Sequence, residues 1–198
     1  MIYSFDGYIP VIHPSAFIHD QATITGNVTI GENVYIGPGA AVRGDWGSIE
    51  IKDGCNIQEN CTIHMFPGIN LVLEEDAHIG HGAIIHGAHI GRNVLVGMNS
   101  VIMDNAEIGE ESIIGALTMI PAGKIFERRS LIVGNPGKRI KEVSEEMIQW
   151  KTKGTQLYQT LPNLCRQSLK EVEPLREISA NRKKQMPIYQ TWKEIKSK

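Results

Sequence analysis

Aliphatic residues recur along this chain at intervals of six. Short insertions near residues 42–51 and 63–73 interrupt the period, and a single five-residue step follows residue 85. The period fits neither the 3.6 residues of an α-helical turn nor the alternation of a simple strand. The aliphatic positions are Ile18, Ile24, Ile30, Ile36, Val42, Ile51, Ile57, Ile63, Leu73, Ile79, Ile85, Ile90, Val96, Ile102, Ile108, Ile114 and Ile120.

A small or β-branched residue stands four places after most of these aliphatics, and glycine directly follows several of them. A period of six with small residues suits a short strand followed by a tight corner. Repetition of that unit predicts a parallel β-helix, a solenoid whose coils bury one another. The aliphatics then point inward, and Cys55 and Cys61 occupy the small-residue slot of the core. We expect between five and six coils, a prism roughly 27 Å long at ~4.8 Å per coil.

The pattern changes after residue 137, so we divide the chain into a β-helix domain (1–137) and a C-terminal helical segment with a basic tail (138–198). Residues 144–147, Ser-Glu-Glu-Met, are typical of a helix start. The apolar residues that follow predict one or two amphipathic helices with a break near Gly154 or Pro162. Residues 174–198 are expected to be weakly ordered.

Composition agrees with a tightly wound β structure, because aromatics make up only 6% of the 198 residues and glycine accounts for 20 of them. Residues 1–137 hold 6 Lys+Arg and 15 Asp+Glu, a net charge of −9, and residues 138–198 hold 14 and 7, a net charge of +7. The overall −2 argues against nucleic acid as a partner. The basic tail is either a solvated helix surface or an attraction for an anionic ligand such as a nucleotide-bearing thioester.

The sequence also suggests where the chain resides. It has no apolar run long enough to span a bilayer and no secretory signal, so we expect no membrane partner. Three cysteines without a CxxC pair favour a reducing compartment, the cytoplasm.

Two histidines occupy equivalent positions on the predicted lattice. His64 follows Ile63 and His86 follows Ile85, so both side chains point outward from one face, one coil apart. Arg43 continues this column. Two stacked imidazoles can share a metal ion or can be ordinary surface residues. A catalytic zinc needs a third protein ligand, and His81, around a corner, meets the other two only from a second subunit. The simplest closed arrangement is a homotrimer with shared sites.

The remaining histidines are expected to be ordinary surface residues. They are His13, His19, His78 and His89.

Several motifs together resemble the gamma-class carbonic anhydrase family. They are Arg-Gly-Asp at 43–45, the segments 56–60 and 80–87, and His64. The resemblance implies a left-handed parallel β-helix that forms a homotrimer with a three-histidine metal site at each subunit interface. It would make His64, His81 and His86 the ligands of Zn²⁺, with Fe²⁺ or Co²⁺ possible.

The same resemblance assigns roles to further residues. Arg43 and Asp45 would form the interface ion pair of the family, and Gln58 would face the metal-bound water. Tyr158, on the tail helix, is a further candidate that could reach the site of a neighbouring subunit.

Within this family, segments 93–104, 145–151, 158–159 and 173–178 resemble first the branch that acts in phenylacetate degradation and next the carnitine-operon branch. This resemblance implies a metal-dependent thioesterase whose metal-bound hydroxide hydrolyses a CoA thioester of the phenylacetate pathway. The loop at 65–70 contains no acid that could export protons, which disfavours fast CO₂ hydration. An apolar rim of Trp46, Met65 and Phe66 would instead bind an acyl or aryl group.

Three alternatives remain open at this point. The chain could be a gamma-class carbonic anhydrase that acts on CO₂ and bicarbonate. It could be a hexapeptide acyltransferase, which uses a histidine base and needs no metal. It could also be a non-catalytic scaffold with a vestigial metal site.

Overall fold

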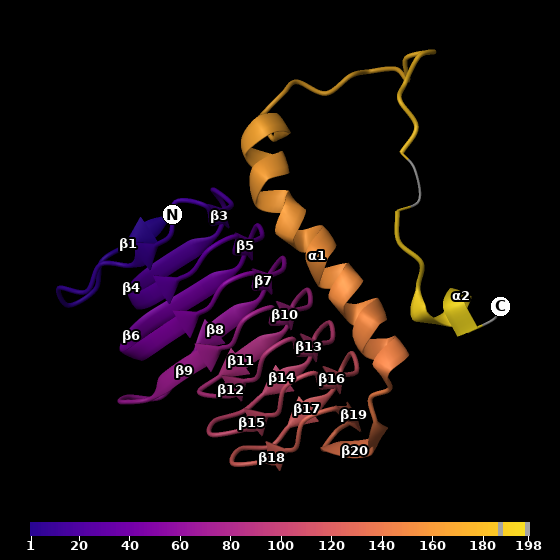
Figure 1. Ribbon diagram of the computed structural model, residues 1–198. Helices are drawn as coiled ribbons and strands as arrows, with labels where there is room; N and C mark the ends of the chain where they lie inside the picture. Colours follow the sequence, from indigo (N-terminus) through magenta and orange to yellow (C-terminus); the bar gives the residue numbers. More distant parts are fainter. Residues whose placement is uncertain (186–187, 197–198) are drawn as a thin grey trace.

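The computed structural model describes residues 1–185 and 188–196, and it confirms a parallel β-helix followed by a C-terminal helix (Figure 1). The coils follow one another from the N-terminal strands, in the upper part of Figure 1, down to the hairpin of β19 and β20. The strands are β1 (Ile2–Tyr3), β2 (Val11–Ile12), β3 (Phe17–Ile18), β4 (Thr23–Ile30), β5 (Tyr35–Ile36), β6 (Ala41–Ile51), β7 (Asn56–Ile57), β8 (Thr62–His64), β9 (Asn70–Leu73), β10 (His78–Ile79), β11 (Ile84–His86), β12 (His89–Ile90), β13 (Leu95–Val96), β14 (Val101–Ile102), β15 (Glu107–Ile108), β16 (Ile113–Ile114), β17 (Met119–Ile120), β18 (Ile125–Phe126), β19 (Ser130–Gly134) and β20 (Gly137–Glu142).

Each strand pairs in parallel with the equivalent strand of the next coil, so equivalent residues stack in columns. One sheet runs β3-β5-β7-β10-β13-β16-β19, with β20 added antiparallel at its end. A second, 12-stranded sheet covers the other two faces, because the long strand β6 turns a corner and pairs with both β8 and β9. The strand pairing therefore continues to Glu142.

The inward aliphatics form one continuous core in which most side chains are fully buried. Cys55 and Cys61 lie in this core, as predicted. The repeat extends beyond the expected range, since Phe126 and Ile132 are also buried. Asparagine recurs three residues after an inward aliphatic and takes a positive φ at the coil corner, a conformation that its short polar side chain tolerates. These corner residues are Asn33, Asn60, Asn93, Asn99 and Asn105.

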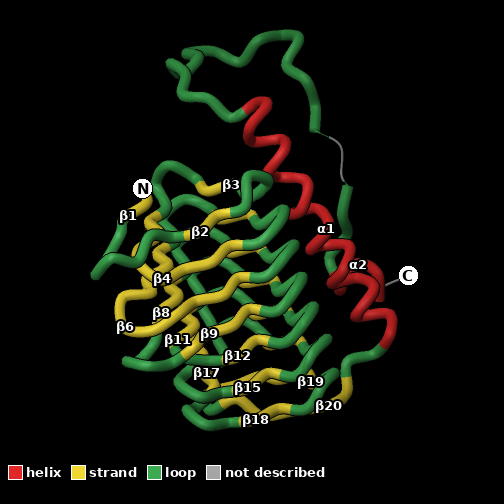
Figure 2. Tube along the Cα trace, turned by 60° about the vertical axis from the view of Figure 1, so that its left-hand side comes forward, coloured by secondary structure: helices red, strands yellow, loops and turns green. Residues whose placement is uncertain are grey.

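The C-terminal segment forms one long helix, α1 (Glu145–Ser168), which runs back along the solenoid from its last coil towards its first (Figure 2). The predicted start is confirmed, because the Ser144 side chain caps the helix by accepting from the Met147 N–H. The predicted break is wrong. Pro162 is buried inside the continuous helix, and packing against the solenoid outweighs its missing N–H.

A column of outward residues lies on the sheet that α1 covers. The pairing register places one residue of each coil in it, and its character changes from aromatic through polar to aliphatic. In order along the solenoid it contains Phe17, Tyr35, Asn56, His78, Leu95, Ile113 and Leu131.

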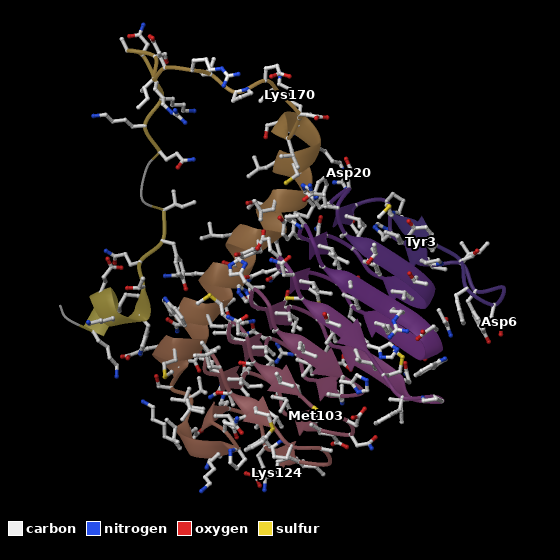
Figure 3. All side chains as sticks on the ribbon, turned by 180° about the vertical axis from the view of Figure 1, so that it is seen from behind. Tyr3, Asp6, Asp20, Met103, Lys124 and Lys170 are labelled. Carbon is white, nitrogen blue, oxygen red and sulfur yellow. The ribbon has the colours of Figure 1, made fainter. Side chains whose placement is uncertain are left out.

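Beyond α1 the chain returns alongside the helix and ends in the short helix α2 (Trp192–Lys196) (Figures 1 and 2). The Trp150 ring stacks on Tyr189, and the Trp150 indole N–H donates to the Gln190 carbonyl. Of the expected weakly ordered region 174–198, residues 186–187 and 197–198 lie outside the described residues. Tyr3 and Asp6 project on the side of the solenoid away from α1 (Figure 3). No helix in the described parts of the chain is long and apolar enough to cross a membrane.

Candidate functional site: a histidine pair between two carboxylates

The predicted stacking of two histidines is confirmed. Strands β8 and β11 pair so that His64 and His86 lie directly opposite each other on adjacent coils. Nδ1 of His64 lies 3.3 Å from Nε2 of His86. Because the inward Ile63 and Ile85 fix the register, both imidazoles are forced outward at the same level.

The outer nitrogen of each ring faces a carboxylate. Nε2 of His64 lies 2.9 Å from Asp45 Oδ1, and Nδ1 of His86 lies 2.6 Å from Asp104 Oδ1. The guanidinium of Arg43 also donates to Asp45, so these two residues pair within one chain, and their predicted role at a subunit interface stays a prediction. Burial alone would raise the pKa of Asp45, but hydrogen bonding from His64 and the charge of Arg43 hold it below its ordinary value. Asp45 is therefore a carboxylate at neutral pH.

This arrangement fixes where the ring protons reside. A carboxylate only accepts, so each outer nitrogen carries its N–H. The inner nitrogens then present two lone pairs to one point. Such a point takes up a cation, either a proton shared by the rings or a metal ion. Two nitrogens bound to a tetrahedral zinc at 2.0–2.1 Å would lie about 3.3–3.4 Å apart, so the observed 3.3 Å fits a metal without rearrangement. A hydrogen-bonded carboxylate behind each ring is also usual for metal-ligating histidines.

Asp104 was not among the residues that the sequence predicted for the site. It follows His86 by 18 residues, whereas the register from β11 to β14 is 17 because of the five-residue step after Ile85, so Asp104 lies one coil further along the solenoid and one position past the residue equivalent to His86. That spacing was the available signal.

Trp46 and Phe66, which the sequence predicts for a substrate rim, lie against the two imidazoles. The Trp46 ring is 5.7 Å from that of His64, and the Phe66 ring is 5.2 Å from that of His86. Both aromatics are about half exposed. Met65 does not belong to this rim, because its side chain is fully buried in the core. The alternation of Ile63 inward and His64 outward turns Met65 inward again.

The other predicted residues gather elsewhere on the chain. Gln58, His81 and Tyr158 line a cavity between α1 and the solenoid that His64 and His86 do not reach. His81 is exposed, with Nδ1 hydrogen-bonded to Glu59. Within one copy of the chain, the described residues contain no group of three side chains placed to hold a metal ion.

The surface role expected for His78 is wrong. Its imidazole is partly covered by α1, and it contacts Gln58 at 2.7 Å and Asn56 and Thr155 at 3.3 Å. Burial lowers the pKa of His78 to about 3, so the ring is neutral at physiological pH. Gln58 is correspondingly buried and shares its amide with Asn56 and His78.

The coils define a hexapeptide-repeat protein. The family model described as bacterial transferase hexapeptide (six repeats) matches residues 9–44 and 87–122, and that of the hexapeptide repeat of succinyl-transferase matches residues 27–64.

Relatives match over almost the whole chain. The carnitine operon protein CaiE of Escherichia coli K12 is 47% identical over 91% of this chain and 92% of its own length. CaiE of a Proteus species is 47% identical over the same shares. The chain therefore belongs to the CaiE family of hexapeptide-repeat proteins.

Two solved structures are similar as well. A hexapeptide transferase family protein from Anaplasma phagocytophilum shares 34% identity at a TM-score of 0.79, covering 82% of this chain and 96% of that one. A candidate acetyltransferase from Bacillus cereus shares 39% identity at a TM-score of 0.77, covering 82% and 97%.

These comparisons correct the expected function. The phenylacetate-pathway thioester hydrolase of the sequence analysis is wrong, because the relatives are carnitine-operon proteins and the similar structures are transferases. The resemblance had ranked the phenylacetate branch ahead of the carnitine-operon branch, and that order is not supported.

Proposed function

We propose that the chain is an acyltransferase that moves an acyl group from a CoA thioester to a hydroxyl or amine. The observation that carries the proposal is the histidine pair, whose inner nitrogens present two lone pairs to one point between Asp45 and Asp104. The similarity to proteins described as transferases supports the reaction class.

The geometry supplies a general base. The acceptor X–H gives its proton to an inner nitrogen while X attacks the thioester carbonyl. The C–S bond then breaks, and the CoA thiolate leaves and takes that proton. Asp104 and Asp45 hold the outer N–H groups and so keep the lone pairs aimed at the acceptor. Trp46 and Phe66 cover the rings and reduce competition from water.

We also propose that the active form is a homotrimer. His81 is exposed beside the apolar cavity, and a second copy would bring it to the histidine pair of the first. Tyr158 and Gln58, which line the same cavity, would approach the site with it. CoA and a small acceptor are then the partners, and the cytoplasm, where CoA is made, is the compartment.

One observation favours a second function, the CO₂ hydration of gamma-class carbonic anhydrases. The 3.3 Å separation of the inner nitrogens fits two ligands of Zn²⁺, and His81 of a second copy would complete the set. A zinc ion bound there would supply a Lewis acid that lowers the pKa of bound water to near 7. Fe²⁺ or Co²⁺ would suit the same nitrogen ligands.

Two assays on the same preparations separate these functions. CoA release from acetyl-CoA is followed with and without a panel of amines and alcohols, and CO₂ hydration is followed by stopped flow. Each assay uses EDTA-treated and zinc-loaded protein. Acyl transfer requires CoA release that depends on the acceptor and survives EDTA treatment. Activity on CO₂ that appears only with zinc would support the second function instead.

His86→Ala should abolish either activity. The matched control is His89→Ala, which removes an exposed histidine on another face. CoA release that needs no acceptor would contradict acyl transfer.

A further inference from the structure

A cavity of about 660 Å³ lies between α1 and the sheet beneath it. One wall is the aliphatic part of the outward column, Leu95, Ile113 and Leu131, stacked by register on successive coils. Met147, Trp150 and Leu157 of α1 form the opposite wall. Outward positions of a solenoid ordinarily meet water. Here α1 covers a column of aliphatic outward residues and leaves open space above it, and this space is an apolar chamber.

The two ends of the chamber differ in polarity. At the polar end are Gln58, His78 and Tyr158. His78 is satisfied by its neighbours, and the Tyr158 ring packs edge-on against it at 5.1 Å. The Tyr158 hydroxyl has no hydrogen-bond partner in the described parts of the chain, so it is free to donate to a carbonyl oxygen. His81 lies at the same end, which places the mouth of the chamber at the interface of the proposed trimer.

The lining also indicates the charge of the occupant. Two lysines line the cavity: Lys141 is exposed to solvent, and Lys151 is buried, with its Nζ donating to the Asp76 carbonyl at 2.9 Å and to Asn93 Oδ1 at 2.5 Å. With its amine already engaged and its pKa lowered by burial to about 7, Lys151 is a poor partner for a ligand carboxylate. The buried part of the chamber therefore suits an uncharged hydrocarbon chain with one carbonyl at its polar end, and the exposed Lys141 offers a positive charge only at the solvent side.

We infer that this chamber holds the acyl group of the thioester, and that the chain accepts acyl groups of medium length rather than acetyl alone. The carbonyl would lie at the Tyr158 end, beside His81, and the hydrocarbon would extend along Leu95 and Ile113. This inference rests on the proposed function and names its substrate class.

The test is the affinity for acyl-CoA of increasing chain length, measured by calorimetry on the full chain without an acceptor. Each buried methylene should tighten binding by about three- to fourfold, so octanoyl-CoA should bind at least about tenfold more tightly than acetyl-CoA. Leu95→Trp fills the chamber and should remove this difference between octanoyl-CoA and acetyl-CoA. Ile113→Phe, a smaller change, should shorten the preferred chain if Leu95→Trp fails to fold.

The matched control is Glu107→Trp, in the same outward position of the same coil but on a face away from α1. It should keep the full preference for octanoyl-CoA. An affinity that does not depend on chain length, or a preference that survives Leu95→Trp, would overturn the inference. So would a change of oligomeric mass caused by Leu95→Trp, since the chamber would then be a contact between copies. Chain-length-dependent binding without acceptor-dependent CoA release would retain the chamber and refute acyl transfer.

Discussion

The Asp104 carboxylate takes the space that a side chain on residue 87 would need. A Cβ atom on Gly87 would lie 2.5 Å from Asp104 Oδ1, the same oxygen that holds His86. Gly87 also has a φ of +59°. The glycine that directly follows His86 therefore makes room for the group that orients it.

Gly87→Ala should accordingly disturb the site as well as the backbone. Positive φ alone costs an alanine roughly 1 kcal/mol, and displacement of Asp104 should add to that loss. Gly123→Ala is the matched control, because Gly123 has a φ of +67° with open space around it. Thermal melts should show Gly87→Ala as the less stable variant, and only Gly87→Ala should lose activity. Equal losses in both variants would show that Asp104 moves aside freely.

Asp104→Asn should change which nitrogen of His86 carries the proton. The Asn amide can donate to Nδ1, so the proton would move to Nε2 and the inner lone pair would be lost. We expect activity to fall on the order of 100-fold or more with little change in melting temperature. The ¹⁵N shifts of the His86 ring report the tautomer directly, whatever the reaction. An unchanged tautomer would contradict the assigned role, and Glu107→Gln serves as the control.

The burial of His78 predicts a loss of stability in acid. The folded state keeps the ring neutral because its pKa is about 3, whereas the unfolded chain protonates it near 6.5. The unfolded state therefore binds the extra proton between these values, and the free energy of unfolding should fall as the pH drops from 6.5 to 3. The full shift corresponds to at most about 5 kcal/mol. Urea titrations of wild type and His78→Gln should differ in this slope, and parallel slopes would refute the prediction.

The burial of Lys151 predicts a gain of stability at alkaline pH. Its pKa is about 7 in the folded state and 10.5 in the unfolded chain, so the unfolded chain binds more protons between these values. The free energy of unfolding should therefore rise as the pH increases from 7 to 10.5, by at most about 5 kcal/mol. Lys151→Met should flatten this rise, whereas the exposed Lys153→Met on the same helix should not. The measurement is the denaturant midpoint at each pH.

The lattice of the solenoid was predictable because a strict period converts sequence distance into position. Ile63 and Ile85 are equivalent positions on adjacent coils, and each is directly followed by a histidine, so His64 stacks on His86. The same count, carried one coil further, reaches Met103, and Asp104 is the next residue. The inward orientation of Met65 was equally accessible, since it follows from alternation within one strand.

The period does not predict the contacts that α1 makes with the solenoid. His78 occupies an outward position like that of His89, yet it is largely covered, because a helix distant in sequence packs over its face. The uninterrupted passage of α1 through Pro162 has the same origin, because tertiary packing outweighs local preference. Contacts between the repeats and a segment without repeats depend on how that segment packs on the solenoid, and the spacing of residues does not encode this packing.

The length of α1 places a numerical constraint on the whole protein. A helix of 24 residues is about 36 Å long, which equals the height of between seven and eight coils at ~4.8 Å each. Adding or deleting one coil would change the height of the solenoid by ~4.8 Å, the length of about three residues of α-helix. Coil number in this architecture can therefore change only in whole steps of about 18 residues, and each step calls for a compensating change of nearly one helical turn in a different part of the gene.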